Sequence, residues 1–194
     1  MDFDLEIAVK GIVFNLLEEV VVQQYGAGTW DDLLDAAGVG GSYTSLGSYP
    51  DEEVEKLVMA AAAALGLQPA EVLRWFGRSA LPLLAIRFPA FFTGHSTTRP
   101  FILSLNSIIH PEVRKLYAGA HCPHFRFEDA ADGALMMGYD SPRKLCALAH
   151  GFIEGAAAHF GEAVQVDHLR CMHNQDPDCL LSIRVLGPAS AHVH

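Results

Sequence analysis

The sequence predicts an α+β fold with a helical N-terminal lobe and a C-terminal lobe that combines one helix with an antiparallel sheet. Apolar residues recur at helical spacing up to Tyr117, whereas four short runs typical of strands follow it. Hydrophobic residues make up 51% and charged residues 19% of the 194 positions, enough for a large core. We expect one domain over residues 1–185, divided into lobes of 1–117 and 118–185, with a disordered tail over 186–194.

The N-terminal lobe begins with two predicted helices. Residues 11–25 carry apolar side chains at helical spacing and are followed by Gly26, a residue type that commonly ends helices. Thr29 is the expected cap of a short helix over residues 30–37. The Gly/Ser-rich segment 38–49 is expected to be a loop.

Proline marks each of the next three predicted helices. Ser48 and Pro50, followed by three acidic residues, start a helix that runs to about residue 65, since acids suit the positive end of a helix dipole. Pro69 lies in the first turn of the next helix, which Pro82 is expected to kink or end. Residues 100–117 are helical again, with Pro111 inside.

The C-terminal lobe contains four predicted strands and one helix. The helix covers residues 142–160, with Ser141 as its N-cap and Gly161 as its stop. The strands lie on either side of it, two before and two after, at residues 125–127, 134–139, 163–168 and 180–185.

The charge and the apolar runs exclude several classes of function. The formal net charge of −10 argues against binding to nucleic acid or to anionic membranes. The longest apolar runs are too short or too interrupted to span a bilayer, and the acidic N-terminus is no secretory signal. We therefore expect a cytoplasmic protein whose four cysteines are thiols or metal ligands rather than disulfides.

His110 is the first candidate site residue. It shares one predicted helix face with Leu103, Asn106, Val113 and Tyr117, by the spacing of three and four residues. A histidine on such a face is either a core residue with satisfied ring nitrogens or an axial ligand to a metal cofactor. The spacing alone leaves both interpretations open.

Tyr139, Ser141 and Arg143 form the second candidate site. They alternate in sequence, so on a strand they would face one way. The guanidinium of Arg143 stays charged and needs an anion, which is either a protein carboxylate or the carboxylate or phosphate of a ligand. Two hydroxyls beside it suit a ligand, and a salt bridge on the surface is the alternative.

Cys146, His168, Cys171 and Cys179 form the third candidate site, spaced C-x21-H-x2-C-x7-C. Thiolates and imidazole are the preferred ligands of zinc, and four of them close a tetrahedral structural site. The alternatives are a disulfide between Cys171 and Cys179 or unrelated thiols. Cys122 is outside this pattern and is expected to be a small apolar filler.

Together these features resemble the H-NOX (haem-nitric oxide/oxygen binding) family over residues 10–185. The likeness rests on KGIVFNLLEEVV, IIHPEVRKLY, YDSPR and the cysteine-rich end. It implies haem b between the two lobes, with His110 as the axial ligand of ferrous iron and Tyr139, Ser141 and Arg143 on the propionates. It also implies that Pro123 packs against the porphyrin and that the cysteines and His168 bind zinc, as in one bacterial branch.

The resemblance further implies an apolar distal pocket. Members that bind oxygen place a tyrosine donor in the helix after the triplet, and the matching position here is Leu148. Nitric oxide needs no such donor because, once bound, it carries less negative charge. Selectivity for nitric oxide is therefore expected, unless Asn15, Tyr25 or His95 reaches the iron. The expected distal wall is Val13, Leu17, Leu73, Leu84, Leu148 and Phe152.

The resulting functional hypothesis is a nitric oxide sensor, not an enzyme, that regulates a separate signalling protein. A cytosolic histidine kinase is the first expected partner, and an enzyme of cyclic-di-GMP metabolism is the second. Pro111, next to the ligand histidine, is expected to tune how firmly His110 holds iron. The alternative is a zinc-thiolate redox module without functional haem. A hydrolase is disfavoured because a four-ligand zinc site has no open position.

Overall fold

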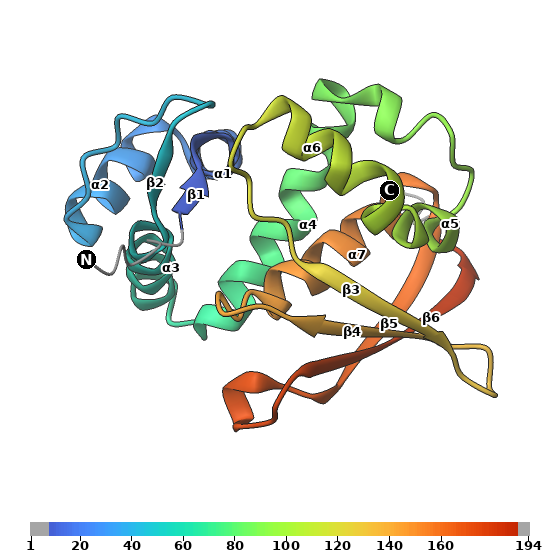
Figure 1. Ribbon diagram of the computed structural model, residues 1–194. Helices are drawn as coiled ribbons and strands as arrows, with labels where there is room; N and C mark the ends of the chain where they lie inside the picture. Colours follow the sequence, from blue (N-terminus) through green and yellow to red (C-terminus); the bar gives the residue numbers. More distant parts are fainter. Residues whose placement is uncertain (1–7, 190–194) are drawn as a thin grey trace, which may run out of the picture.

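The helices and strands form two lobes in the computed structural model, which describes residues 8–189 (Figure 1). The first lobe contains a short antiparallel pair, β1 and β2, and the long helix α4. Its elements are β1 (Ala8–Lys10), α1 (Gly11–Tyr25), α2 (Ala27–Ala37), β2 (Ser48–Pro50), α3 (Asp51–Leu65) and α4 (Pro69–Arg87). The predicted α+β fold, helical first and sheet second, is confirmed.

Several boundaries follow the expected signals, and others do not. Helix α3 begins at Asp51 with acids in its first turn, and α4 begins at Pro69 with a capping box between Gln68 and Glu71. Thr29 lies inside α2 rather than capping it, and its hydroxyl donates to the Tyr25 carbonyl at 3.0 Å. Pro82 does not end α4, which continues to Arg87.

The helical stretch predicted over residues 100–117 is divided into three pieces. These are α5 (Thr98–Leu103), a π-helix (Leu105–Ile109) and α6 (His110–Leu116); a 3₁₀ turn (Pro89–Phe91) precedes them. In the π-helix the His110 amide donates to Leu105, five residues back. Pro111 has no amide hydrogen to continue this ladder, so the helix restarts with Pro111 in the first turn of α6.

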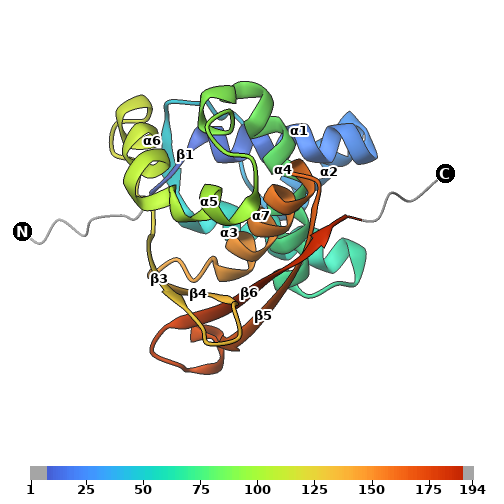
Figure 2. The ribbon, with the colours of Figure 1, turned by 90° about the vertical axis from the view of Figure 1, so that its right-hand side faces the viewer.

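The second lobe is a four-stranded antiparallel sheet in the order β3-β4-β6-β5, with α7 over one face (Figure 2). Its elements are β3 (His124–Asp129), β4 (Leu135–Asp140), α7 (Cys146–His159), β5 (Glu162–Arg170), a 3₁₀ turn (Met172–Asn174) and β6 (Cys179–Pro188). Strand β6 continues past the expected boundary at 185. Residues 190–194 of the expected tail lie outside the described residues.

The expected N-cap of α7, Ser141, is wrong. Residues 141–144 form a turn in which the Lys144 amide donates to the Ser141 carbonyl at 3.0 Å. Lys144 has a φ of 51°, in the left-handed region, so the α-helix cannot begin before it. The helix starts at Cys146, and Gly161, with a φ of 69°, follows its end as expected.

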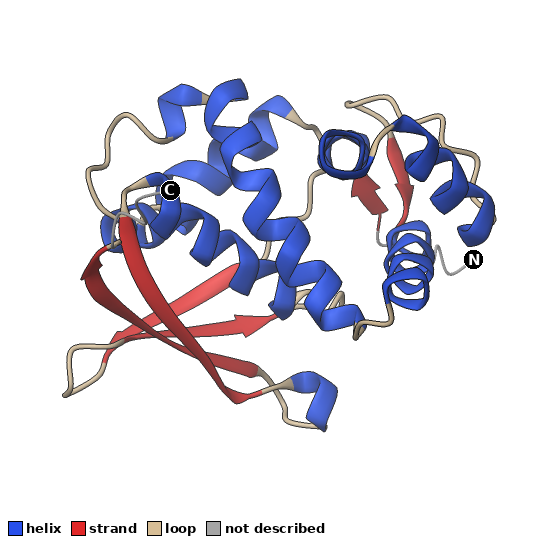
Figure 3. Cartoon of the chain, turned by 180° about the vertical axis from the view of Figure 1, so that it is seen from behind, coloured by secondary structure: helices blue, strands red, loops and turns tan. Residues whose placement is uncertain are grey.

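Helices α4 and α7 join the two lobes by close backbone contact (Figure 3). Glycine permits this approach, because a Cβ added at Gly151 would lie 2.0 Å from the Arg74 carbonyl oxygen and one at Gly77 2.5 Å from that of Leu148. One apolar core fills the helical lobe and a second lies between α7, α5 and the sheet.

Within the described residues, no single helix is long and apolar enough to cross a membrane. The bent pair α3 and α4 passes that test by length and composition.

Candidate functional site

A cavity of about 350 Å³ lies where the two lobes meet. Its walls come from α1, α4, α6, α7, β3 and β4, and most of the side chains that line it are apolar. Val13, Leu84, Leu148 and Phe152 are among them, as expected for the distal wall. The polar and titratable residues in the lining are Lys10, His110, Tyr117, His121, Cys122, Tyr139, Ser141 and Arg143.

Leu17 and Leu73 do not line this cavity, so their predicted place in the distal wall is wrong. Both are buried, with 4% and 8% of their surface exposed, in the core of the helical lobe. Helices α1 and α4 contact each other there, and the faces that carry these two leucines take part in that packing.

His110 lies in the cavity wall with its Nδ1 buried and without a hydrogen-bond partner. Burial lowers its pKa to about 4, and the charge of Arg114 acts in the same direction. The ring is therefore neutral at neutral pH and carries a lone pair. A buried polar atom without a partner is rare in proteins, so His110 is suited to a ligand that accepts a lone pair.

The π-helix that leads to His110 is attached to the sheet lobe. The side chain of Asn106 pairs with the backbone of Phe125 in β3, donating to its carbonyl at 2.6 Å and accepting from its amide at 3.1 Å. Because β3 is an edge strand of its sheet, these two bonds satisfy backbone groups of Phe125 that no neighbouring strand pairs with. They place the start of α6, and with it His110, in a defined position relative to the sheet.

Arg143 lies at the mouth of the cavity, and the structure gives it a protein anion. Its Nε donates to Asp51 Oδ2 at 2.7 Å, and its two Nη groups donate to the carbonyls of His121 and Ala8. The side chains of Arg143 and Asp51 are 14% and 21% exposed. Three of the five guanidinium hydrogens are thus used, which leaves two for a ligand.

Asp51 was not expected to take part in the site. It lies 92 residues from Arg143 in the sequence, and its acidic neighbours suggested only a helix start. Ion pairing joins the N-terminus of α3 to the turn before α7, so it connects the two lobes. The other oxygen of this carboxylate, Oδ1, is buried without a partner.

Replacing Arg143 by leucine is expected to lower the free energy of unfolding by about 2 kcal/mol, because the Asp51 carboxylate is left partly buried and unpaired. The double variant with Asp51→Asn is expected to recover part of this loss. Urea denaturation of the wild type, both single variants and the double variant measures the coupling. Strictly additive changes would mean that the pair does not contribute.

Tyr139 is 2% exposed and lies at the end of β4, with its hydroxyl oxygen accepting from the Leu145 amide at 3.0 Å. Burial raises its pKa, so the phenol keeps its proton and can donate it. Ser141 and Arg143 follow in the turn, and all three residues line the cavity together with Pro123. The fold therefore brings the three residues of the predicted triplet together in the wall of one cavity.

The three polar residues that could have supplied a distal donor do not line the cavity. Asn15 is engaged elsewhere, since its amide donates to the Tyr43 carbonyl and its oxygen accepts from Ser45. Tyr25 is 49% exposed and packs on Trp75. His95 packs against Phe101.

Cys146, Cys171 and Cys179 form a second candidate site between α7 and the β5–β6 hairpin. Their sulfur atoms lie within 4.8 Å of one another, and the Cys146 and Cys171 sulfurs are 3.7 Å apart. All are free thiols. Three sulfurs at this spacing are suited to hold a thiophilic ion such as zinc.

His168, the expected fourth ligand, lies outside this group of three thiols. Its Nε2 is instead 3.2 Å from Nδ1 of His150, and the two rings stack. The structure therefore groups three of the four predicted ligands, and His168 as the fourth ligand stays a prediction. Sequence reasoning also missed His150, although its position four residues after Cys146 places both on one face of α7.

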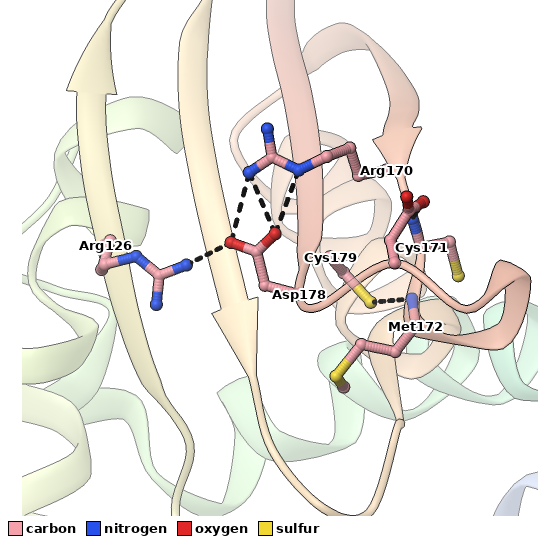
Figure 4. A network of polar contacts seen from close by, with 7 residues as sticks. Arg126, Arg170, Cys171, Met172, Asp178 and Cys179 are labelled. Carbon is pink, nitrogen blue, oxygen red and sulfur yellow. Dashed lines mark hydrogen bonds and ion pairs between the residues drawn. The ribbon is translucent and has the colours of Figure 1, made fainter.

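Polar contacts shape the hairpin that carries two of the cysteines (Figure 4). Asp178 bridges Arg126 of β3 and Arg170 of β5, directly before Cys179. The Met172 amide donates to the Cys179 sulfur at 3.3 Å, a contact that favours a thiolate.

Burial raises the pKa of the Cys146 and Cys179 thiols. Metal binding at these sulfurs must therefore release protons, and its affinity must fall as the pH falls.

Comparison with known proteins identifies the family of this chain. The sequence profile of the haem-NO-binding family matches residues 10–168. An H-NOX protein of Shewanella oneidensis, solved by crystallography in the Fe(II)NO state, shares 32% identity with a TM-score of 0.86. The match covers 92% of this chain and all of that one.

Two further structures share this fold. The S. oneidensis domain solved by NMR in the Fe(II)CO state has 32% identity and a TM-score of 0.82, with 91% of this chain and 98% of that chain covered. An unliganded Fe(II) H-NOX protein of K. algicida shares the fold at 20% identity, with a TM-score of 0.80 over 96% of this chain and all of that one.

Proposed function

This chain belongs to the haem-NO-binding family of haem-based gas sensors, which are not enzymes, and we propose that it senses nitric oxide. The observation that carries the proposal is His110, a neutral imidazole with one buried, unpartnered nitrogen in the wall of a largely apolar cavity. In this proposal His110 is the axial ligand of haem b. Haem iron, when bound, supplies the coordination position that takes the gas.

The rim of the cavity suits the carboxylates of haem. Tyr139 can donate its phenolic proton, Ser141 offers a hydroxyl, and Arg143 has two guanidinium hydrogens left after its protein contacts. Pro123 directly precedes β3 and lines the cavity. It is proposed to pack on the porphyrin.

Selectivity for nitric oxide over oxygen is proposed to arise from a missing donor. The lining side chains of α1, α4 and α7 that were expected at the distal wall are Val13, Leu84, Leu148 and Phe152, and none can donate a hydrogen bond. Their role is to exclude water and to offer no partner to bound oxygen. Nitric oxide does not depend on such a partner.

The test is an absorption spectrum of the protein expressed with haem available and reduced, then exposed to air and to nitric oxide. We expect a five-coordinate ferrous spectrum that air changes only by slow oxidation and that nitric oxide shifts. A stable spectrum of an oxygen complex would contradict the selectivity. The absence of any haem spectrum would contradict the sensor and favour the zinc-thiolate alternative.

Signal output is proposed to run through His110 and its helix. Because α6 starts at His110 and follows the π-helix that Asn106 ties to Phe125, a shift of the His110 ring moves α6 against the sheet lobe. A partner, first a cytoplasmic histidine kinase and second a cyclic-di-GMP enzyme, would read that movement. Equal kinase autophosphorylation with the ligand-free and nitric oxide-loaded protein would contradict this output.

We also propose a structural zinc ion at Cys146, Cys171 and Cys179, with His168 as the fourth ligand. Metal analysis is expected to find about one zinc per chain in the wild type. Cys171→Ser is expected to lose it and to lower stability by several kcal/mol, because zinc binding is coupled to folding. Cys122→Ser is the matched control, since Cys122 lines the cavity at His110 and does not belong to the group of three thiols. Zinc that exchanges freely without unfolding would contradict a structural role.

A redox-sensing module is the second candidate function. The observation in its favour is the 3.7 Å separation of the Cys146 and Cys171 sulfurs, close enough for oxidation to link them after a small movement. A redox module would not depend on His110, whereas the gas sensor would. His110→Ala would leave a thiol-based signal unchanged and would abolish a haem-based one.

A further inference from the structure

Two contacting histidines, His150, which is buried, and His168, which is exposed, lie close to the three thiols. His150 follows Cys146 by four residues on α7 and is 7% exposed. His168 on β5 is in register with Leu181 on β6, two residues from Cys179, and both of these β6 side chains are fully buried. His168 therefore shares a sheet face with Cys179. His150 is thus one helical turn from Cys146, and His168 pairs with the residue two positions after Cys179 on β6.

The contact between the two rings needs one proton and one lone pair. His150 Nδ1 and His168 Nε2 are 3.2 Å apart, and a neutral imidazole carries a hydrogen on only one of its nitrogens. Two arrangements satisfy this contact: either His150 Nδ1 donates or His168 Nε2 donates. The choice depends on what the far nitrogen of His150 meets.

That far nitrogen faces a carboxylate. His150 Nε2 is buried without a hydrogen bond, and the nearest ionic group is Glu154 Oε1 at 3.7 Å. Glu154 is held in place by Arg74 of α4, whose Nε donates to Oε2 at 2.9 Å. The negative oxygen favours the hydrogen of His150 on Nε2, because the N–H dipole then points at it. His150 Nδ1 is left with the lone pair.

We propose that His150 is a positioning residue for the zinc site, which accepts a hydrogen bond from His168 Nε2 and so leaves His168 Nδ1 as the ligand nitrogen. The inference rests on the zinc site proposed above. Metal-bound histidines commonly direct their second nitrogen to a fixed acceptor, which sets the tautomer and the ring orientation. Here Arg74, Glu154 and His150 form that support, and they extend it from α4 across α7 to β5.

The test compares two variants of the full chain by zinc affinity in competition with a chelator. His150→Leu removes the acceptor and is expected to weaken zinc binding on the order of 10–100-fold. His150→Asn can place an amide oxygen where Nδ1 lies and is expected to remain close to the wild type. His124→Leu, at an exposed position, is the control. Unchanged affinity in His150→Leu, or an equal loss in both variants, would overturn the proposal.

The zinc-loaded wild type supplies a measurement that no folding defect can affect. A long-range proton–nitrogen correlation spectrum of the imidazole rings is expected to find His168 with a hydrogen on Nε2 and metal on Nδ1. Metal on Nε2, or no metal on His168, would overturn the inference while the thiol site stands. A wild type that binds no zinc would overturn both the site and its positioning residue.

Discussion

His110→Ala is expected to abolish the five-coordinate ferrous haem spectrum and to lower haem retention by on the order of tenfold or more, about 1.4 kcal/mol. The alanine removes the cavity-lining imidazole that is proposed to bind the iron. Added imidazole is expected to restore the spectrum, since it supplies the lost ligand without changing the fold. The measurement is a titration of ferrous haem into the variant, with and without imidazole.

His124→Ala is the control for this variant. His124 is exposed at the start of β3, close to His110, and should leave the spectrum as in the wild type. A His110→Ala protein that keeps the wild-type spectrum without imidazole would show that another side chain holds the iron. His121, which also lines the cavity, would then be the next residue to replace.

Leu148→Tyr is expected to give the protein a stable oxygen complex, which the wild type is proposed not to form. Leu148 lies on the cavity face of α7, so a tyrosine there adds a hydroxyl donor to the expected distal wall, where Val13, Leu84 and Phe152 have none. A donor worth about 1.5–3 kcal/mol to a charged acceptor would raise oxygen affinity roughly 10–150-fold. The measurement is the spectrum of the reduced variant in air and its rate of oxidation.

Leu148→Phe separates the hydroxyl from the added bulk. It fills nearly the same space as the tyrosine and carries no donor, so it should behave as the wild type does in air. Oxygen binding in both variants would mean that shape, not hydrogen bonding, controls selectivity. Oxygen binding in neither would mean that residue 148 does not reach the gas.

Local signals in the sequence predicted most of the elements. The acidic turn after Pro50 and the Gln68–Glu71 capping box act on backbone groups within three or four residues, so the starts of α3 and α4 were predictable. The π-helix before His110 was not. Its Asn106 bonds to Phe125 in β3, a strand that reaches it only in the folded chain.

The cavity mouth was predictable from its triplet, but its wall was only partly so. Tyr139, Ser141 and Arg143 are close in sequence and remain close in the turn after β4. Leu17 and Leu73 carry the same apolar signal as Val13 and Leu84 yet lie in the core. Hydrophobic spacing identifies the buried face of a helix, and it does not distinguish a packed neighbour from a cavity.

By itself, therefore, the sequence determined the α+β order of the lobes, the histidine of the cavity, the polar triplet at the cavity and the three grouped cysteines. Only the tertiary structure decided that Arg143 pairs with Asp51 and that His168 contacts His150. The physical reason is range. Caps, turns and periodicity depend on residues a few positions apart, whereas the partner of a buried charge or imidazole is set by which elements meet when the chain folds.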